Sequence, residues 1–363
     1  MPAGHRAVSV LYQALLTGLV LTLVTRRGED QAAEFVFRLF RRQHLEKFLP
    51  GLAKLGLDRL PHAVACAQYH YLSNQVGGVK TEYARESDRK AWVRYPPPRW
   101  IWYGASICGI PSRVNAAMLH GWHGHNGVTL GNPRLGFVCT GQTVDGDPGL
   151  EGYYLEHDHD LAPGERVRFV RGERMPAFDP AAAPRLDPVA WPAERLDTVV
   201  ARYAMEYVRT TLPVALALLE PDDTRALLGH AARLIGMQYH DETARLLEID
   251  GRGPEPFARY LAALAEAQGE AVASGSTPRG TPAATSPSAS RRWPRRDPTV
   301  ASRSSWRHPA PLRSRAEVHP CEADDSSRSC SARSSSAAPA SSPPASRPRR
   351  AARAGRAATS SWW

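Results

Sequence analysis

The sequence has few cysteines and no cysteine pair at metal-binding or redox spacing. The five that occur are spread over 363 residues without a CxxC motif. Neither a disulfide framework nor a zinc knuckle is therefore predicted, and a cytoplasmic location is expected. The loop at residues 131–137 also lacks the GxGxxG and P-loop spacings, so a nucleotide-phosphate site is not predicted.

The sequence also lacks an unbroken apolar run of the length that a membrane-spanning helix needs. Residues 8–24 come closest, but they include Tyr12, Gln13 and two threonines, whereas a span takes roughly 20 apolar residues. No small-residue cleavage site precedes the basic pair Arg26-Arg27, as a signal peptide would require. We therefore expect a helix of the protein core and no membrane span.

Branched aliphatic residues are nearly absent after residue 272. Residues 273–363 consist largely of Ser, Ala, Pro and Arg, and they contain only Val300, Leu312 and Val318 of that type. Such a segment buries too little apolar surface to offset the entropy of its chain, so a disordered tail is predicted. Its cations are all arginine, a bias that GC-rich codons produce, and we consider a frameshifted or unselected extension as its origin.

The basic charge of the chain belongs to this tail. Residues 273–363 hold 16 of the 46 Lys and Arg and 5 of the 36 Asp and Glu, or +11, which leaves 30 against 31, or −1, in residues 1–272. The high overall charge therefore says nothing about the folded part. No nucleic-acid partner is predicted for the folded domain.

A helical period marks both ends of residues 1–272. Helices are predicted at 8–25, 29–49 and 62–76, and again at 193–219, 223–247 and 256–269. Gly28 separates the first two helices, and Pro50-Gly51 is expected to stop the second. These assignments make residues 1–76 and 193–270 two helical regions.

A period of two marks residues 79–170 between them. Strands are predicted at 79–84, 91–95, 135–143 and 150–158, with a short addition at 166–170, and a helix at 112–123 with Ser112 as its N-cap. Residues 171–192 are expected to form an irregular connector. The predicted class is α+β, a small antiparallel sheet (β-β-α-β-β) packed against N- and C-terminal helices in one domain, 1–272.

The stretch LHGWHGHNG at residues 119–127 holds His120, His123 and His125. On a helix His120 and His123 share a face, and Gly124 in a left-handed conformation would end the helix and return His125 toward them. Three interpretations stay open: histidines that meet the carbonyls of a helix end, an acid–base site, or a metal site. A divalent metal is not favoured, because no named metal signature is present.

Two further clusters could carry chemistry. Arg94 lies among aromatic residues and could bind a carboxylate, although an ion pair with Glu82 across the hairpin is the alternative. Candidate substrate-binding aromatics are Tyr83, Trp92 and Tyr154. Glu156, at the end of a strand, could orient an imidazole.

Cys66, His70 and Asn74 form a stripe on one helix, at successive positions four residues apart. A thiol beside an imidazole has the residue types of nucleophilic catalysis. The alternative is a core cysteine and a histidine bonded to a backbone carbonyl. Both interpretations stay open.

The order of elements over residues 60–169 and the turn Thr143-Val144-Asp145-Gly146-Asp147-Pro148 resemble the bacterial L-2-amino-thiazoline-4-carboxylic acid hydrolase-like family and the 4-vinyl reductase-type small-molecule-binding domains. That family commonly has a cysteine after this turn, where this chain has Gly149-Leu150-Glu151, so no catalytic residue is transferred. The resemblance implies a cytosolic α+β domain with a pocket between helices and sheet. The stretches at 69–74 and 122–127 look like signatures of an uncharacterised bacterial family.

The leading functional hypothesis is a hydrolase of a small cyclic or carboxylated substrate. His123 or His120 would be the general base, Arg94 would bind the carboxylate and Glu156 would orient the imidazole. The competing hypothesis is a non-catalytic ligand-binding or sensor domain with an aromatic-lined pocket. A third is a scaffold whose exposed aromatic residues form a homodimer.

Overall fold

The computed structural model describes residues 1–99 and 101–271, which fall within one compact unit. The tail predicted at 273–363 lies outside the described residues.

The N-terminal helices follow the predicted pattern and extend beyond it. Helix α1 (Ala3–Arg27) and helix α2 (Glu29–Lys54) are separated by Gly28, whose φ of 87° is a left-handed value that glycine adopts without strain. The predicted stop at Pro50 is wrong, because α2 continues through it to Lys54. The turn beyond the proline is held by buried Leu52 and by a 3.0 Å bond from Leu55 N to Gly51 O.

Five strands form one sheet in the order β1-β2-β4-β3-β5. Their bounds are Glu82–Arg85 (β1), Lys90–Tyr95 (β2), Leu135–Gly141 (β3), Leu150–Glu156 (β4) and Val167–Phe169 (β5). The β1–β2, β2–β4 and β3–β4 pairs are antiparallel, as predicted, whereas β5 runs parallel to β3. The α+β class is confirmed, with a sheet that is mixed.

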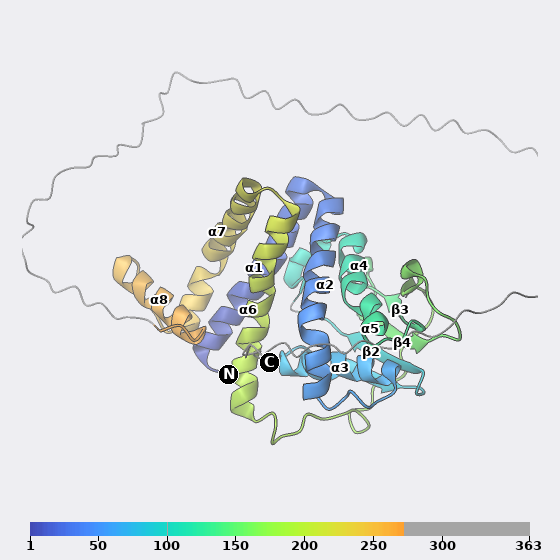
Figure 1. The fold of residues 1–363 in the computed structure, drawn as a ribbon. Coiled ribbons are helices and arrows are strands. Elements are labelled where there is room, and N and C mark those ends of the chain that lie inside the picture. Colours follow the sequence, from blue (N-terminus) through green and yellow to red (C-terminus); the bar gives the residue numbers. More distant parts are fainter. Residues whose placement is uncertain (100, 272–363) are drawn as a thin grey trace, which may run out of the picture. The chain divides into compact units, whose positions relative to one another are not determined.

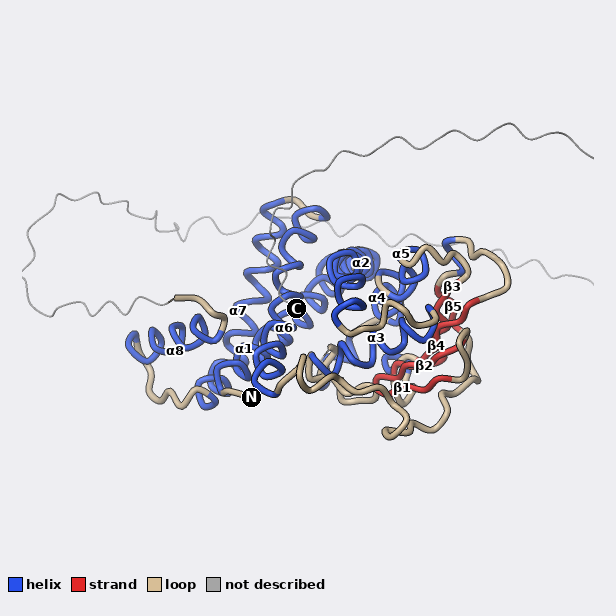
Figure 2. Tube along the Cα trace, turned by 60° about the horizontal axis from the view of Figure 1, so that its bottom comes forward, coloured by secondary structure: helices blue, strands red, loops and turns tan. Residues whose placement is uncertain are grey.

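Helices cover one face of the sheet (Figure 2), and part of the connector packs on the other. Helix α3 (His62–Val76) packs on β1, β2 and β4, and helix α4 (Ser112–Gly121) packs on α2. On the opposite face Trp92 and Tyr153 pack with Met175. Met175 belongs to residues 171–192, a segment without helix or strand.

The C-terminal helices surround α1 rather than the sheet (Figure 1). They are α6 (Ala193–Leu218), α7 (Pro221–Leu246) and α8 (Pro254–Ala267), and each packs on α1. Helix α1 is longer than the sequence suggested, and by length and composition it could cross a membrane. Half of its most apolar window is buried, and none of residues 7–24 is exposed in the described part of the chain.

Candidate functional site

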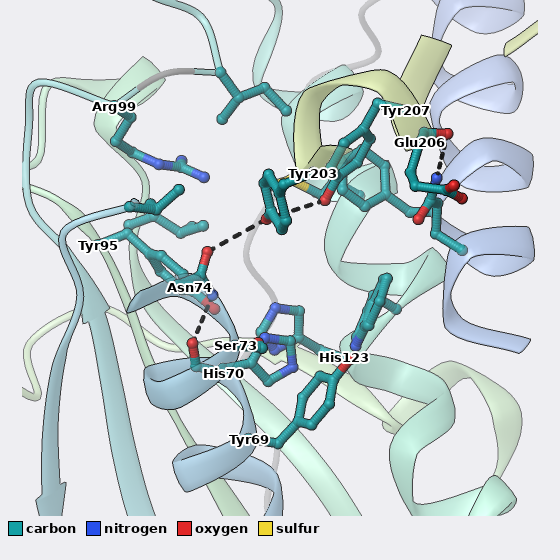
Figure 3. A pocket seen from close by; sticks show the side chains of 17 residues that line it. Tyr69, His70, Ser73, Asn74, Tyr95, Arg99, His123, Tyr203, Glu206 and Tyr207 are labelled. Carbon is teal, nitrogen blue, oxygen red and sulfur yellow. Dashed lines mark hydrogen bonds between the residues drawn. The ribbon is translucent and has the colours of Figure 1, made fainter. Parts of the chain in front are cut away.

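A pocket lies between α3, the loop that follows β2, the turn after α4, and α6 (Figure 3). The space open to the centre of a water molecule is about 60 Å³, several times what a single water requires. Spacing on the helices sets two of its walls. His70, Ser73 and Asn74 on α3, like Tyr203, Glu206 and Tyr207 on α6, stand three and four residues apart and therefore share a helix face.

Two stacked imidazoles form the floor of the pocket. The rings of His70 and His123 lie 4.1 Å apart between centroids with an interplanar angle of 10°. Both side chains are buried. Burial lowers the pKa of His70 to about 3 and the pKa of His123 well below its usual value, so both rings are neutral at pH 7.

Hydrogen bonds from the sheet side hold His123 in place. The Tyr154 hydroxyl lies 2.7 Å from His123 Nδ1, and the Asn126 amide donates to the same hydroxyl at 2.9 Å. Phe137 packs against the imidazole, 4.3 Å away between ring centroids. Tyr154 was a predicted substrate-binding residue, but in the structure it is fully buried and positions a histidine.

Arg99 brings a charge into the pocket. It follows the Pro96-Pro97-Pro98 run after β2, and its guanidinium carbon lies 5.3 Å from the centroid of the Tyr95 ring. Burial lowers the pKa of Arg99 to about 10, against an opposing effect of the nearby tyrosines. The side chain therefore stays cationic at pH 7.

The carboxylate that lines the pocket does not neutralise this cation. Glu206 is paired with Lys47 at 3.0 Å and with Arg209 at 3.1 Å. Arg99 forms no ion pair within the described residues, although its charge is near enough to lower the pKa of His123. The pocket therefore holds a cation without a counter-ion beside a neutral imidazole.

The three clustered histidines point in three directions. His123 enters the pocket, His120 packs on Phe169, and His125 lies beside Phe37 of α2. No group of three or more His, Cys, Asp or Glu is arranged to hold a metal within the part of the chain that the structure describes. The metal interpretation of LHGWHGHNG, which was open but not favoured, therefore has no assembled set of ligands among the described residues.

The predicted helix stop at Gly124 is also wrong. Gly124 does not have a positive φ, and the chain passes from α4 through a 3-10 turn (His123–His125) into the short helix α5 (Asn126–Thr129). A β-carbon on Gly124 would lie 2.8 Å from a methyl group of Val167. The glycine is needed for the close approach of β5.

The predicted carboxylate-binding residue, Arg94, lies on the other face of the sheet. Its Nε donates to Glu82 at 2.6 Å and its Nη1 contacts Glu151 at 3.3 Å. Trp92 shares that face and donates to Glu86 at 2.6 Å. Side chains alternate along a strand, so Tyr95 faces the helices while these two residues face away. The cross-strand ion pair was the correct alternative.

Glu156 and Tyr83 likewise lie outside the pocket. Glu156 accepts hydrogen bonds from Asn132 at 3.0 Å and Arg134 at 2.8 Å, so the predicted orientation of His123 falls to Tyr154 instead. The Tyr83 hydroxyl accepts a 3.2 Å bond from Gln68. Glu156 thus stabilises the loop before β3, and Tyr83 joins β1 to α3.

The Cys66–His70 dyad is not formed as a nucleophile and base. Cys66 is fully buried, does not line the pocket, and has a pKa that burial raises. His70 stacks on His123 instead. A thiol without solvent access or thiolate character is a core residue.

Sequence reasoning missed Arg99, Tyr203 and Tyr207. Arg99 stands outside any periodic segment, directly after a proline run that ends the hairpin. The two tyrosines have a recognisable spacing of four residues on a helix, and their hydroxyls lie 3.3 Å apart. That pair could have been noticed, but nothing local to α6 indicates that it meets α3 through Asn74 (3.5 Å).

Comparison of the chain with protein-family models, with curated proteins and with solved structures found no match.

Proposed function

We propose that this domain binds a small planar molecule that carries a carboxylate, with Arg99 as the group that recognises it. The observation that carries the proposal is the guanidinium of Arg99, cationic in the pocket and without an ion pair among the described residues. Arg99 is half-buried, and a partly desolvated charge without an ion pair is less favourable than a paired one. A ligand anion would supply that partner.

The surroundings of Arg99 favour a carboxylate on a flat body. A guanidinium offers parallel N–H donors that match the two oxygens of a carboxylate. Tyr95, the stacked His70 and His123, and Tyr207 supply aromatic walls. Ligand pockets of this type combine apolar rings with a few polar groups that fix orientation. The space of about 60 Å³ open to water centres suits one small ring system.

Binding is better supported than catalysis because the acid–base groups are poorly matched to neutral pH. An imidazole with a pKa of about 3, as burial gives His70, is a weak general base, since an efficient one titrates near the working pH. Cys66 is closed off from the pocket. We therefore propose ligand binding. Of the chemistry that the resemblance suggests, the proposal keeps only the carboxylate of the ligand.

The test compares aromatic carboxylates with their matched amides. Thermal unfolding of the full chain would be followed with benzoate, pyridine carboxylates and thiophene carboxylates, and with the amide of each. A ligand that binds the folded state raises the melting temperature. We expect carboxylates to do so and the amides to bind at least about tenfold more weakly, because a charge-assisted bond contributes about 1.5–3 kcal/mol.

Arg99→Gln is the informative variant, and Arg113→Gln is its control, because Arg113 is 65% exposed and pairs with Asp30 outside the pocket. In Arg99→Gln the carboxylates should no longer raise the melting temperature, whereas in Arg113→Gln they should raise it as in the wild type. The proposal fails if no carboxylate stabilises the wild-type chain, or if Arg99→Gln responds as the wild type does.

A second function, hydrolysis with His123 as general base, needs the opposite tautomer, in which His123 Nδ1–H donates to the Tyr154 hydroxyl across the 2.7 Å contact and Nε2 is free to take a proton. It predicts turnover of aryl esters or lactones that His123→Gln abolishes and that Tyr154→Phe slows. Turnover that is unchanged in His123→Gln would exclude this function.

A further inference from the structure

A line of buried polar side chains runs from the pocket to α2. It begins at His123, continues through Tyr154 and Asn126 to His44, and ends at Arg41. Asn126 and Tyr154 are fully buried, as is His44, whereas Arg41 is half-buried. Asn126, His44 and Arg41 have no part in the proposed recognition of a carboxylate.

The direction of the hydrogen bond between Arg41 and His44 is fixed. Arg41 Nη1 lies 2.8 Å from His44 Nδ1, and a guanidinium can only donate. His44 Nδ1 must therefore accept, which leaves the hydrogen of the neutral ring on Nε2. The ring is neutral because burial, with the charge of Arg41 as a second cause, lowers the pKa of His44 to about 3.

The hydrogen on His44 Nε2 in turn determines the orientation of the Asn126 amide. The Asn126 side chain interacts with His44 in the sense that raises the pKa of the imidazole, as an acceptor does. His44 Nε2 and Asn126 Oδ1 are both buried, and no hydrogen bond within the described residues satisfies either atom, so each is available to the other. An N–H on His44 therefore requires the amide oxygen of Asn126 to face it, and the amide nitrogen to face Tyr154 and Cys66.

The last step sets the hydrogen on His123. With Asn126 Nδ2 donating at 2.9 Å, the Tyr154 oxygen accepts, and its own hydrogen is directed to His123 Nδ1 at 2.7 Å. Neutral His123 then carries its hydrogen on Nε2. Had the amide been reversed, two donors would face each other at His44.

We propose that Arg41 fixes the tautomer of His123 through His44, Asn126 and Tyr154, so that the pocket presents the Nε2–H of His123 as a donor. Arg41 is a positioning residue that never touches the ligand. The consequence for the ligand rests on the proposed function: besides the carboxylate at Arg99, it needs a neutral acceptor, such as a carbonyl oxygen or a ring nitrogen, for His123. The tautomer itself does not depend on any ligand.

The experiment reads the tautomer directly, on the unliganded full chain labelled with ¹⁵N-histidine. Two-bond ¹H–¹⁵N correlation spectra at pH 7 distinguish Nε2–H from Nδ1–H rings, and His123→Gln assigns the signal of His123. We expect a single Nε2–H tautomer in the wild type. In Arg41→Glu the carboxylate accepts from His44 Nδ1–H, the chain of donors reverses, and His123 should become Nδ1–H.

Arg42→Glu is the matched control, because Arg42 is an exposed neighbour on α2 that pairs with Glu46, and it should leave the Nε2–H tautomer unchanged. If Arg41→Glu does not fold, Arg41→Met serves instead and should give a mixture of tautomers. A wild-type His123 with Nδ1–H, or an unchanged Nε2–H ring in the folded Arg41 variants, overturns the proposal. Neither result bears on carboxylate binding, which Arg99→Gln tests separately.

Discussion

Tyr153 and Tyr154 are neighbours on β4 and make hydrogen bonds of different consequence. Tyr154 faces the helices, where its hydroxyl joins Asn126 to His123. Tyr153 faces the connector, and its hydroxyl donates to Glu173 at 2.7 Å near the surface. Removing one member of a buried pair leaves the others without partners, whereas water can replace a partner near the surface.

Tyr154→Phe should therefore lower the free energy of unfolding by about 1–3 kcal/mol. Tyr153→Phe, the matched control, should lower it by about 0.5–1 kcal/mol, because water can solvate Glu173. Urea denaturation of both variants gives the comparison. Equal losses would show that the network around His123 has no special contribution to stability.

The positions of individual side chains were predicted least well from the sequence. His123 and His70 were both named, but for different sites, because nothing local indicates that α3 and the turn after α4 bring their rings to 4.1 Å. Arg94 was named because it lies among aromatic residues in the sequence, and Arg99 was not considered. The two-residue period of β2 already assigns Arg94 and Tyr95 to opposite faces, and only the packing of α3 decides which face is enclosed.

At the scale of elements, the contact of α4 with α2 depends on Gly121. A β-carbon there would lie 2.5 Å from the carbonyl oxygen of Phe37 and 3.1 Å from the amide nitrogen of Arg41. Both obstacles are backbone atoms of a helix, so the helices would have to separate. Arg41 lies on α2 beside this contact, and the turn with His123 directly follows α4. Separation of the two helices would therefore disturb the pocket.

Gly121→Ala should consequently destabilise the protein by about 1–3 kcal/mol, as overpacking does, despite the better helix propensity of alanine. Gly229→Ala is the control, since Gly229 lies in α7 and a β-carbon there meets nothing within 4 Å. It should stabilise by about 0.5–1 kcal/mol. Thermal unfolding of the two variants tests the opposite signs, and a neutral Gly121→Ala would refute the close contact.

Helices and strands were predicted well from periodicity, and their ends less well. The three C-terminal helices and the four antiparallel strands lie where the patterns place them. Pro50 and Gly124 were treated as stops, because each breaks a helix in isolation. Tertiary contacts outweigh that preference: Leu52 is buried beyond Pro50, and Val167 of β5 occupies the space beside Gly124.

The whole molecule should lose stability in acid because its core contains neutral imidazoles. Burial lowers the pKa values of His44 and His70 to about 3, against about 6.5 in an unfolded chain. The unfolded state therefore binds more protons between these values. Stability is complete above about pH 6.5 and falls as the pH is lowered toward 3, by about 3 kcal/mol for one such histidine at pH 4.

His70→Gln should therefore show a smaller loss of unfolding free energy between pH 7 and pH 4 than the wild type. His159→Gln, at an exposed position, should keep the wild-type slope. Urea denaturation at a series of pH values measures both. A wild-type stability that does not change down to pH 4 would contradict a neutral, buried His70.

The position of α1 has a consequence for the order of synthesis. Its apolar surface is covered by α6, α7 and α8, which are translated last among the described elements. A ribosome adds about 5–20 residues per second, so roughly 10–40 s pass between Arg27 and Pro221. During that interval an emerging segment with the composition of a membrane helix lacks its partners. We expect the nascent chain to depend on chaperones more than the finished protein does.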